Sequence, residues 1–219
     1  MIKLENVKKR YAERTVLDIP LLSIAQGEIV AFAGANGSGK TTLLRLLAGL
    51  IQADEGSAQL PAERLYMPQQ CYAFRGDLVK NITLGGGDAA KARQLLEALE
   101  LSALADKPAR SLSGGELQRL ALCRLLVRDC RVLLLDEPTA ACDARGAELV
   151  LHAIQAYREA HDCAVLMTTH SPVLAAKGAD RLIILNSGKP EADGEPREVL
   201  LHPATEWAKS FIAGWKIEC

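Results

Sequence analysis

The stretch Gly34-Ala-Asn-Gly-Ser-Gly-Lys-Thr-Thr42 has the spacing of a phosphate-binding loop, and it is the strongest indication of the fold in this sequence. It follows segment 28–33, whose apolar residues predict a strand, and precedes a helical pattern over 40–48 with Gly49 as the expected cap. The competing interpretation is a glycine-rich turn with a solvated lysine. The flanking strand and helix favour a nucleotide-binding loop.

The residue types of this loop fit the chemistry of a nucleoside triphosphate. Glycine residues let consecutive amides point at a phosphate, and Lys40 can bridge the β- and γ-phosphate oxygens. The hydroxyl of Thr41 can bind Mg²⁺. We therefore predict ATP and Mg²⁺ as cofactors and Lys40 as a catalytic residue. The nucleotide-binding residues predicted in this stretch are Gly34, Asn36, Gly37, Ser38, Gly39, Lys40, Thr41 and Thr42.

Strand and helix patterns alternate along the rest of the chain. Near-continuous apolar runs separated by helices are typical of a parallel sheet covered on both faces, in which ligands bind beyond the carboxyl ends of the strands. Strands are expected at 2–7, 16–24, 28–33, 57–60, 64–67, 131–136, 163–168 and 181–185. Helices are expected at 40–48, 88–99, 117–127, 144–160, after Pro172, and as one amphipathic helix over 203–215.

Composition narrows the class of protein. The 219 residues include 26 basic and 27 acidic side chains, so the total charge of −1 gives no sign of nucleic-acid binding. No apolar run approaches the ~18 residues of a membrane helix, so we expect a cytoplasmic protein. Six cysteines at irregular spacings, Cys219 among them, are expected to stay reduced.

Two acidic residues end the apolar run 132–135. Asp136 is expected at the tip of a buried strand, where it would hold Mg²⁺, and Glu137 is expected to face the attacking water as a general base. The alternative is that the Asp-Glu-Pro turn only ends the strand. The phosphate-binding loop elsewhere in the chain favours the catalytic interpretation.

Two further polar residues follow expected strands. His170 comes just after the strand at 163–168, so its imidazole is predicted to touch the γ-phosphate and position the water. Gln69 follows the strand at 64–67, and its side-chain amide is predicted to sense the metal or the water. Gln70 is the competing assignment.

A second anion-binding helix start lies in Ser111-Leu-Ser-Gly-Gly-Glu-Leu-Gln-Arg119. Ser113 stands three residues before Glu116, which predicts a reciprocal cap at the first turn. Gly114 and Gly115 leave bare amides that could approach a phosphate. An isolated helix cap explains this segment locally, but it does not explain why one chain has two segments suited to binding a phosphate.

Taken together, these motifs resemble the ATP-binding-cassette (ABC) ATPases over nearly the whole chain. The resemblance rests on the phosphate loop, the Gln69 loop, the Leu112-Ser-Gly-Gly-Glu116 signature, Asp136-Glu137, Ala140-Ala-Cys-Asp143 and His170. It implies an α/β fold with a P-loop NTPase core, a mostly parallel sheet, a small antiparallel β subdomain and a helical insert. One ABC ATPase domain is expected, with 1–70 and 130–219 as nucleotide-binding core and about 71–129 as helical subdomain.

The resemblance also implies a role for the second anion-binding helix start. In this family the signature residues, here Ser113, Gly114 and Gly115, contact ATP held on a partner's phosphate loop, so two copies pair head to tail around two ATP molecules. Tyr11 occupies the place where the family stacks an aromatic ring on adenine, although it could instead be a strand-packing residue.

A transporter ATPase needs a membrane partner, and the resemblance implies a separate integral membrane permease docked near Gln69 and residues 71–76. We expect a bacterial importer, peripheral on the inner face of the cell membrane, with a solute-binding protein as a further partner and a tungstate-like oxyanion as one candidate cargo. The alternative is an ABC-type ATPase in a process other than transport.

Overall fold

The computed structural model describes residues 1–84 and 86–215. Its larger sheet has the strand order β5-β6-β7-β3-β8-β9, and every neighbouring pair is parallel except β8 and β9. All residues of β3, β6 and β7 are buried, as expected for central strands covered on both faces. The strands are β3 (Ile29–Ala33), β5 (Arg64–Met67), β6 (Val132–Leu135), β7 (Ala164–Thr168), β8 (Arg181–Asn186) and β9 (Lys189–Gly194).

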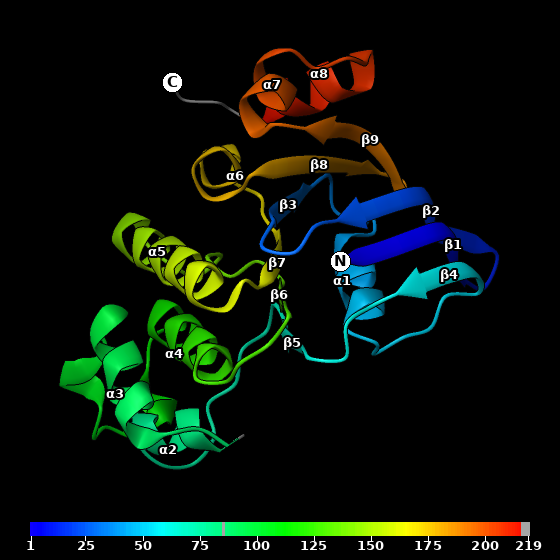
Figure 1. Cartoon of the computed structure of the whole chain (residues 1–219). Helices are drawn as coiled ribbons and strands as arrows, with labels where there is room; N and C mark the ends of the chain where they lie inside the picture. The colour runs from blue at the N-terminus through cyan, green and yellow to red at the C-terminus, as the bar shows by residue number, and fades with distance from the viewer. Residues whose placement is uncertain (85, 216–219) are drawn as a thin grey trace.

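A smaller antiparallel sheet lies beside the parallel one, at the right of Figure 1. It consists of β1 (Ile2–Tyr11), β2 (Arg14–Ile24) and β4 (Glu55–Gln59) in the order β2-β1-β4. Helix α1 (Lys40–Leu47) contributes to one hydrophobic cluster with both sheets, for example through Leu4, Phe32 and Leu43. This packing fixes the helix that follows the phosphate-binding loop.

The remaining helices form a second core on the other face of the parallel sheet. Figure 1 shows α2, α3 and α4 gathered below the sheets, with α4 next to α5. The helices are α2 (Leu78–Thr83), α3 (Ala89–Ala98), α4 (Gly114–Leu126), α5 (Ala144–His161), α6 (Pro172–Gly178), α7 (Pro196–Leu201) and α8 (Glu206–Gly214), with short 3-10 turns at Ser102–Leu104 and Ala109–Ser111.

The observed fold confirms the expected α/β architecture, with a mostly parallel sheet, a small antiparallel sheet and a group of helices between β5 and β6. The expected domain limits stay a prediction. The sequence did not predict α2, β9 or α7. The expected helix over 203–215 was wrong at its start, because the Thr205 hydroxyl accepts a hydrogen bond from Ala208 N and so begins α8 at Glu206.

Within residues 1–84 and 86–215, no helix combines the length and the apolarity needed to span a membrane. Cys219 lies outside the described residues, and the other five cysteines are free thiols.

Candidate functional site

The loop between β3 and α1 leaves no room for side chains at two of its glycines. A Cβ at Gly34 would lie 2.3 Å from the carbonyl oxygen of Leu185, and one at Gly39 would lie 2.7 Å from that of Val16. Both glycines also have positive φ values, 145° and 105°, which other residues rarely adopt. The loop is therefore held tightly against β8 and β2.

Two polar side chains in this loop, Lys40 and Ser38, could take a phosphate as a further hydrogen-bond partner. Lys40 is buried, and its Nζ donates to the carbonyl oxygens of Gly34 and Ala35 at 2.8 and 3.2 Å. Burial lowers the pKa of Lys40, while the charges of Glu137 and Asp136 oppose that effect. The Ser38 hydroxyl is buried without any hydrogen-bond partner. An anion in the loop would satisfy both groups.

Asp136 lies at the tip of β6 and is only 1% exposed. Its Oδ1 accepts hydrogen bonds from Thr168 at 2.8 Å and from Thr41 at 3.2 Å, and its Oδ2 accepts one from Tyr66 at 3.3 Å. Burial and the nearby Asp136 charge raise the pKa of the Tyr66 hydroxyl, which keeps it a donor. Three strands and α1 thus bring one carboxylate and three hydroxyls to one point beside the loop, and oxygen is the ligand type that Mg²⁺ prefers.

Glu137 and His170 lie next to each other. The distance from His170 Nε2 to Glu137 Oε1 is 2.8 Å, and the backbone amide of Glu137 donates to Thr168 Oγ1 at 2.8 Å. Glu137 has a φ of 54°, a left-handed conformation that is unusual for a glutamate. The hydrogen bonds at this turn stabilise that conformation and aim the carboxylate at His170.

A hollow of about 480 Å³ joins these parts. Gln69, Glu137 and His170 line it together with the phosphate loop, whereas Gln70 lines a different hollow with Tyr72. The structure therefore places Gln69, and not Gln70, beside the loop. The loop and strand residues around the hollow are Val16, Asn36, Gly37, Ser38, Gly39, Lys40, Thr41 and Thr42.

The signature residues do not reach this hollow. Ser113 begins α4 with the expected reciprocal cap, since its amide donates to Glu116 Oε2 at 2.7 Å and its hydroxyl accepts from Glu116 N at 3.4 Å. Ser113 and Gly114 are exposed, and Gly115 packs against the Ala141 carbonyl. Within one chain, this turn therefore lies apart from the hollow, and its contact with ATP stays a prediction.

Tyr11 also lies outside the residues that line the hollow. It ends β1, and its side chain is half exposed, with Lys9 Nζ 5.6 Å from the ring centroid. Its stacking on adenine stays a prediction.

Sequence reasoning missed Gln118, which connects the signature helix to the Glu137 turn. Gln118 is 3% exposed; its Nε2 donates to the Glu137 carbonyl at 2.5 Å, and its Oε1 accepts from Ala141 N at 2.7 Å. Thr168 and Tyr66 were missed as well. The only sequence signal for Gln118 was its place in the signature, five residues after Ser113.

Comparison with known proteins identifies the family. The ABC transporter family model matches residues 17–140. The chain is 37% identical over 213 residues to the zinc import ATP-binding protein ZnuC of Pseudomonas fluorescens (strain Pf0-1), covering 92% of this chain and 82% of the relative. It is 36% identical over 228 residues to a sulfate/thiosulfate import ATP-binding protein, CysA 2 of Chromobacterium violaceum, covering 94% of this chain and 62% of that one.

Solved structures agree with this result. A dimeric bacterial ABC transporter cassette superposes with a TM-score of 0.80 at 27% identity, covering 90% of this chain and 99% of that one. The sequence match, the superposition and the hollow beside the phosphate loop lead to the same conclusion: the chain belongs to the ABC transporter family, as its ATP-binding and ATP-hydrolysing component.

Proposed function

We propose that this protein is the ATPase subunit of a bacterial ABC importer. The observation that carries the proposal is the Glu137–His170 pair, 2.8 Å apart, in the wall of the hollow that also contains the phosphate loop. The names of the relatives, which are import ATP-binding proteins for zinc and for sulfate, support import.

In the proposed mechanism, the loop amides and Lys40 bind the β- and γ-phosphates of ATP. Thr41 and Asp136 would hold Mg²⁺, because their oxygens already lie 3.2 Å apart beside the loop and oxygen is the ligand type that Mg²⁺ prefers. The ion would neutralise charge on the phosphates. Glu137 would orient the attacking water and accept its proton, with His170 and Gln69 positioning the reacting groups.

The position of the signature turn supports a head-to-tail dimer. Ser113 and Gly114 are exposed and lie outside their own chain's hollow, so a second copy is the partner whose γ-phosphate they would reach. Two chains related by a two-fold axis would then complete two ATP sites at one interface. The dimeric cassette among the similar structures supports the same assembly.

A second hollow suits a membrane partner. It measures about 230 Å³, and its largely apolar lining includes residues that come shortly after Gln69 in the sequence. Among them, the side chains of Tyr72 and Phe74 are 59% and 50% exposed. We propose that a helix of a separate permease docks here, which would hold the chain on the inner face of the membrane. A solute-binding protein would deliver cargo from the other side.

Cargo is set by those partners in this proposal. Relatives named for a metal cation and for an oxyanion are 37% and 36% identical to this chain, so cassette identity does not discriminate between the two cargo classes. The tungstate-like oxyanion stays a prediction.

Affinity capture from a detergent extract tests the proposal. Tagged protein should recover a polytopic membrane protein, and exchange of Tyr72 and Phe74 for serine should lose it, because the apolar contact is removed. Exchange of the exposed Leu201, which lies on α7, is the matched control. Recovery of ribosomal proteins or DNA in place of a membrane protein would support the alternative ATPase outside transport.

A further inference from the structure

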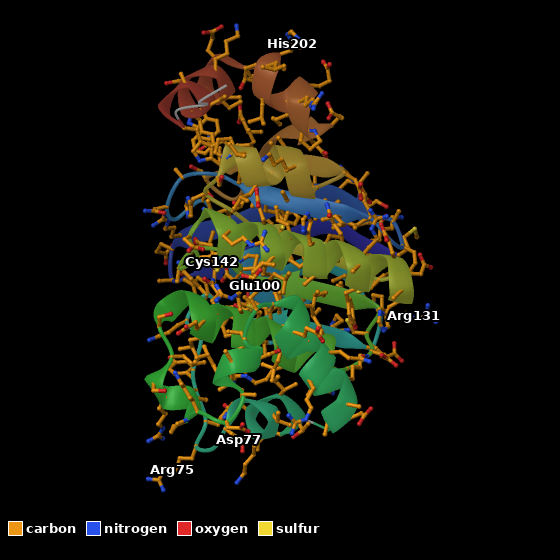
Figure 2. All side chains as sticks on the ribbon, turned by 90° about the vertical axis from the view of Figure 1, so that its left-hand side faces the viewer. Arg75, Asp77, Glu100, Arg131, Cys142 and His202 are labelled. Carbon is orange, nitrogen blue, oxygen red and sulfur yellow. The ribbon has the colours of Figure 1, made fainter. Side chains whose placement is uncertain are left out.

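Two cysteines lie side by side at the amino ends of two inner strands. This is the end of the sheet away from the nucleotide hollow. Cys130 precedes β6 and Cys163 precedes β7, two parallel strands paired at Val132 and Ala164. The carboxyl ends of the same strands carry Asp136 and Thr168. Figure 2 labels Arg131, next to Cys130, at one side of the molecule and Cys142, after the Glu137 turn, toward the other.

The two thiols are already in contact. Their Sγ atoms are 3.6 Å apart, and Cys130 and Cys163 are 5% and 0% exposed. A disulfide has an S–S length of about 2.05 Å, so the sulfurs must approach by about 1.5 Å, a distance within reach of side-chain rotation and small backbone adjustment. We propose that Cys130 and Cys163 form a reversible disulfide when a peroxide oxidises the protein.

Access and hydrogen bonding make Cys130 the thiol that reacts first. Cys130 lines a hollow of about 350 Å³ that the Asp129 and His161 side chains share, whereas Cys163 is closed off behind it. Hydrogen bonds from Cys163 and from Tyr157, 3.6 and 3.3 Å away, lower the pKa of Cys130 against the effect of burial. The hydrogen bond with Cys130 and burial raise the pKa of Cys163. Cys130 is therefore the nucleophile and Cys163 the resolving thiol.

The reaction balances with hydrogen peroxide as the oxidant. The Cys130 thiolate attacks one peroxide oxygen, the O–O bond breaks, and the departing hydroxide takes a proton to become water, leaving a sulfenic acid. The Cys163 sulfur then attacks the Cys130 sulfur. The S–O bond breaks, a second water leaves with the Cys163 proton, and the S–S bond forms. Two thiols are oxidised and one peroxide is reduced.

The other described cysteines do not share this environment. Burial raises the pKa of Cys71, of Cys142 and of Cys123, the last to about 12, so these thiols stay protonated and react slowly. The contrast predicts selective oxidation at one pair.

A cross-link here would join β6 to β7 without entering the nucleotide hollow. The two cysteines are 33 positions apart, so the bond would restrict the unfolded chain and raise the midpoint of thermal unfolding by roughly 5–10 °C.

Mass spectrometry on the full-length protein tests the proposal. After brief exposure to hydrogen peroxide, blocking of remaining thiols and digestion, we expect a peptide pair joined through Cys130 and Cys163 that dithiothreitol separates. Recovery of both residues as blocked thiols under these conditions, or of either one joined to a different cysteine, would overturn the assignment.

Single substitutions separate the two roles. In Cys163→Ser, Cys130 should stop at a sulfenic acid that dimedone traps, whereas Cys130→Ser should give neither adduct nor cross-link. Cys123→Ser is the matched control, because it removes another buried thiol and should leave the cross-link unchanged. A peroxide-induced rise in unfolding temperature that persists in Cys130→Ser would contradict the proposal.

Discussion

The phosphate loop and the signature turn are both glycine-rich helix starts. Only around the phosphate loop does the same chain bring polar side chains from other elements together in one hollow. Lys40 and Asp136 are buried beside the loop. Lys40 and the nearly buried Glu137 line one hollow, to which β2, α1 and the turns after β5, β6 and β7 contribute. At the signature turn, Ser113 is exposed, and its side chain bonds only within its own capping box.

A glycine-rich helix start is therefore not sufficient by itself to form a phosphate site. The loop has one buried hydroxyl without a partner, that of Ser38, in the wall of the hollow where an anion would bind. At the signature turn, Ser113 and Glu116 already cap each other, and Ser113 and Gly114 are exposed. The first region gathers its groups within one chain, whereas in our proposal the second acts on the nucleotide of another copy.

The largest effect should come from the completed region. Glu137→Gln keeps the size of the side chain but removes the proton acceptor, so kcat for ATP hydrolysis should fall by about 10²–10⁴-fold with little change in ATP affinity. Phosphate release and calorimetry measure the two quantities. Glu159→Gln, an exposed site on α5, is the control. Near-normal turnover in Glu137→Gln would remove Glu137 from its proposed role.

Loss of the loop cation should be next in size. Lys40→Ala removes charge-assisted hydrogen bonds to phosphate of about 1.5–3 kcal/mol, which corresponds to an ATP Kd roughly 10–150-fold higher. The exposed Lys209 provides the control, Lys209→Ala. Unchanged binding in isothermal titration calorimetry would contradict the assignment of this loop.

Gln118 connects the two regions, and its removal tests that connection. Gln118→Leu is similar in size but leaves the Glu137 carbonyl and the Ala141 amide without their partner. We expect kcat to fall about tenfold while ATP affinity in the phosphate loop stays near normal, since the loop itself is untouched. Gln94→Leu, on the exposed face of α3, is the comparison. A parallel loss of ATP affinity would indicate a general folding defect.

The smallest effect concerns the support of Asp136. Tyr66→Phe removes one donor from a buried carboxylate and should lower the free energy of unfolding by about 1–2 kcal/mol in urea titration. Tyr72→Phe, at an exposed position, should change it little. Equal stability of the two variants would show that the hydrogen bonds from Thr168 and Thr41 suffice.

The fold and the phosphate loop could be predicted because their signals are local. A strand, a loop of fixed glycine spacing and a helix follow one another within 28–48. Strand β9 was missed because its sequence, Lys189-Pro-Glu-Ala-Asp-Gly194, is polar and contains proline; its conformation depends on pairing with β8. Helix α2 was missed because six residues give too short a pattern, although Asp77 caps it.

The residues of the candidate site also differ in whether a local sequence signal predicts them. Asp136, Glu137 and His170 were predicted because each follows an apolar strand directly. Gln118, Thr168 and Tyr66 act through partners that are distant in sequence, at separations of 19, 32 and 70 residues. No spacing rule reveals such pairs, and only the folded sheet brings them together.

The most direct test of the two-region account mixes two inactive chains. Lys40→Ala disables the loop, and Ser113→Asp keeps a good helix cap while placing negative charge against a phosphate. In a head-to-tail mixed dimer, one site has both defects and the other has none. Equal mixing should therefore restore roughly a quarter of the wild-type ATP turnover. Turnover no higher than that of either variant alone would contradict the claim that each ATP is held between two copies of this chain.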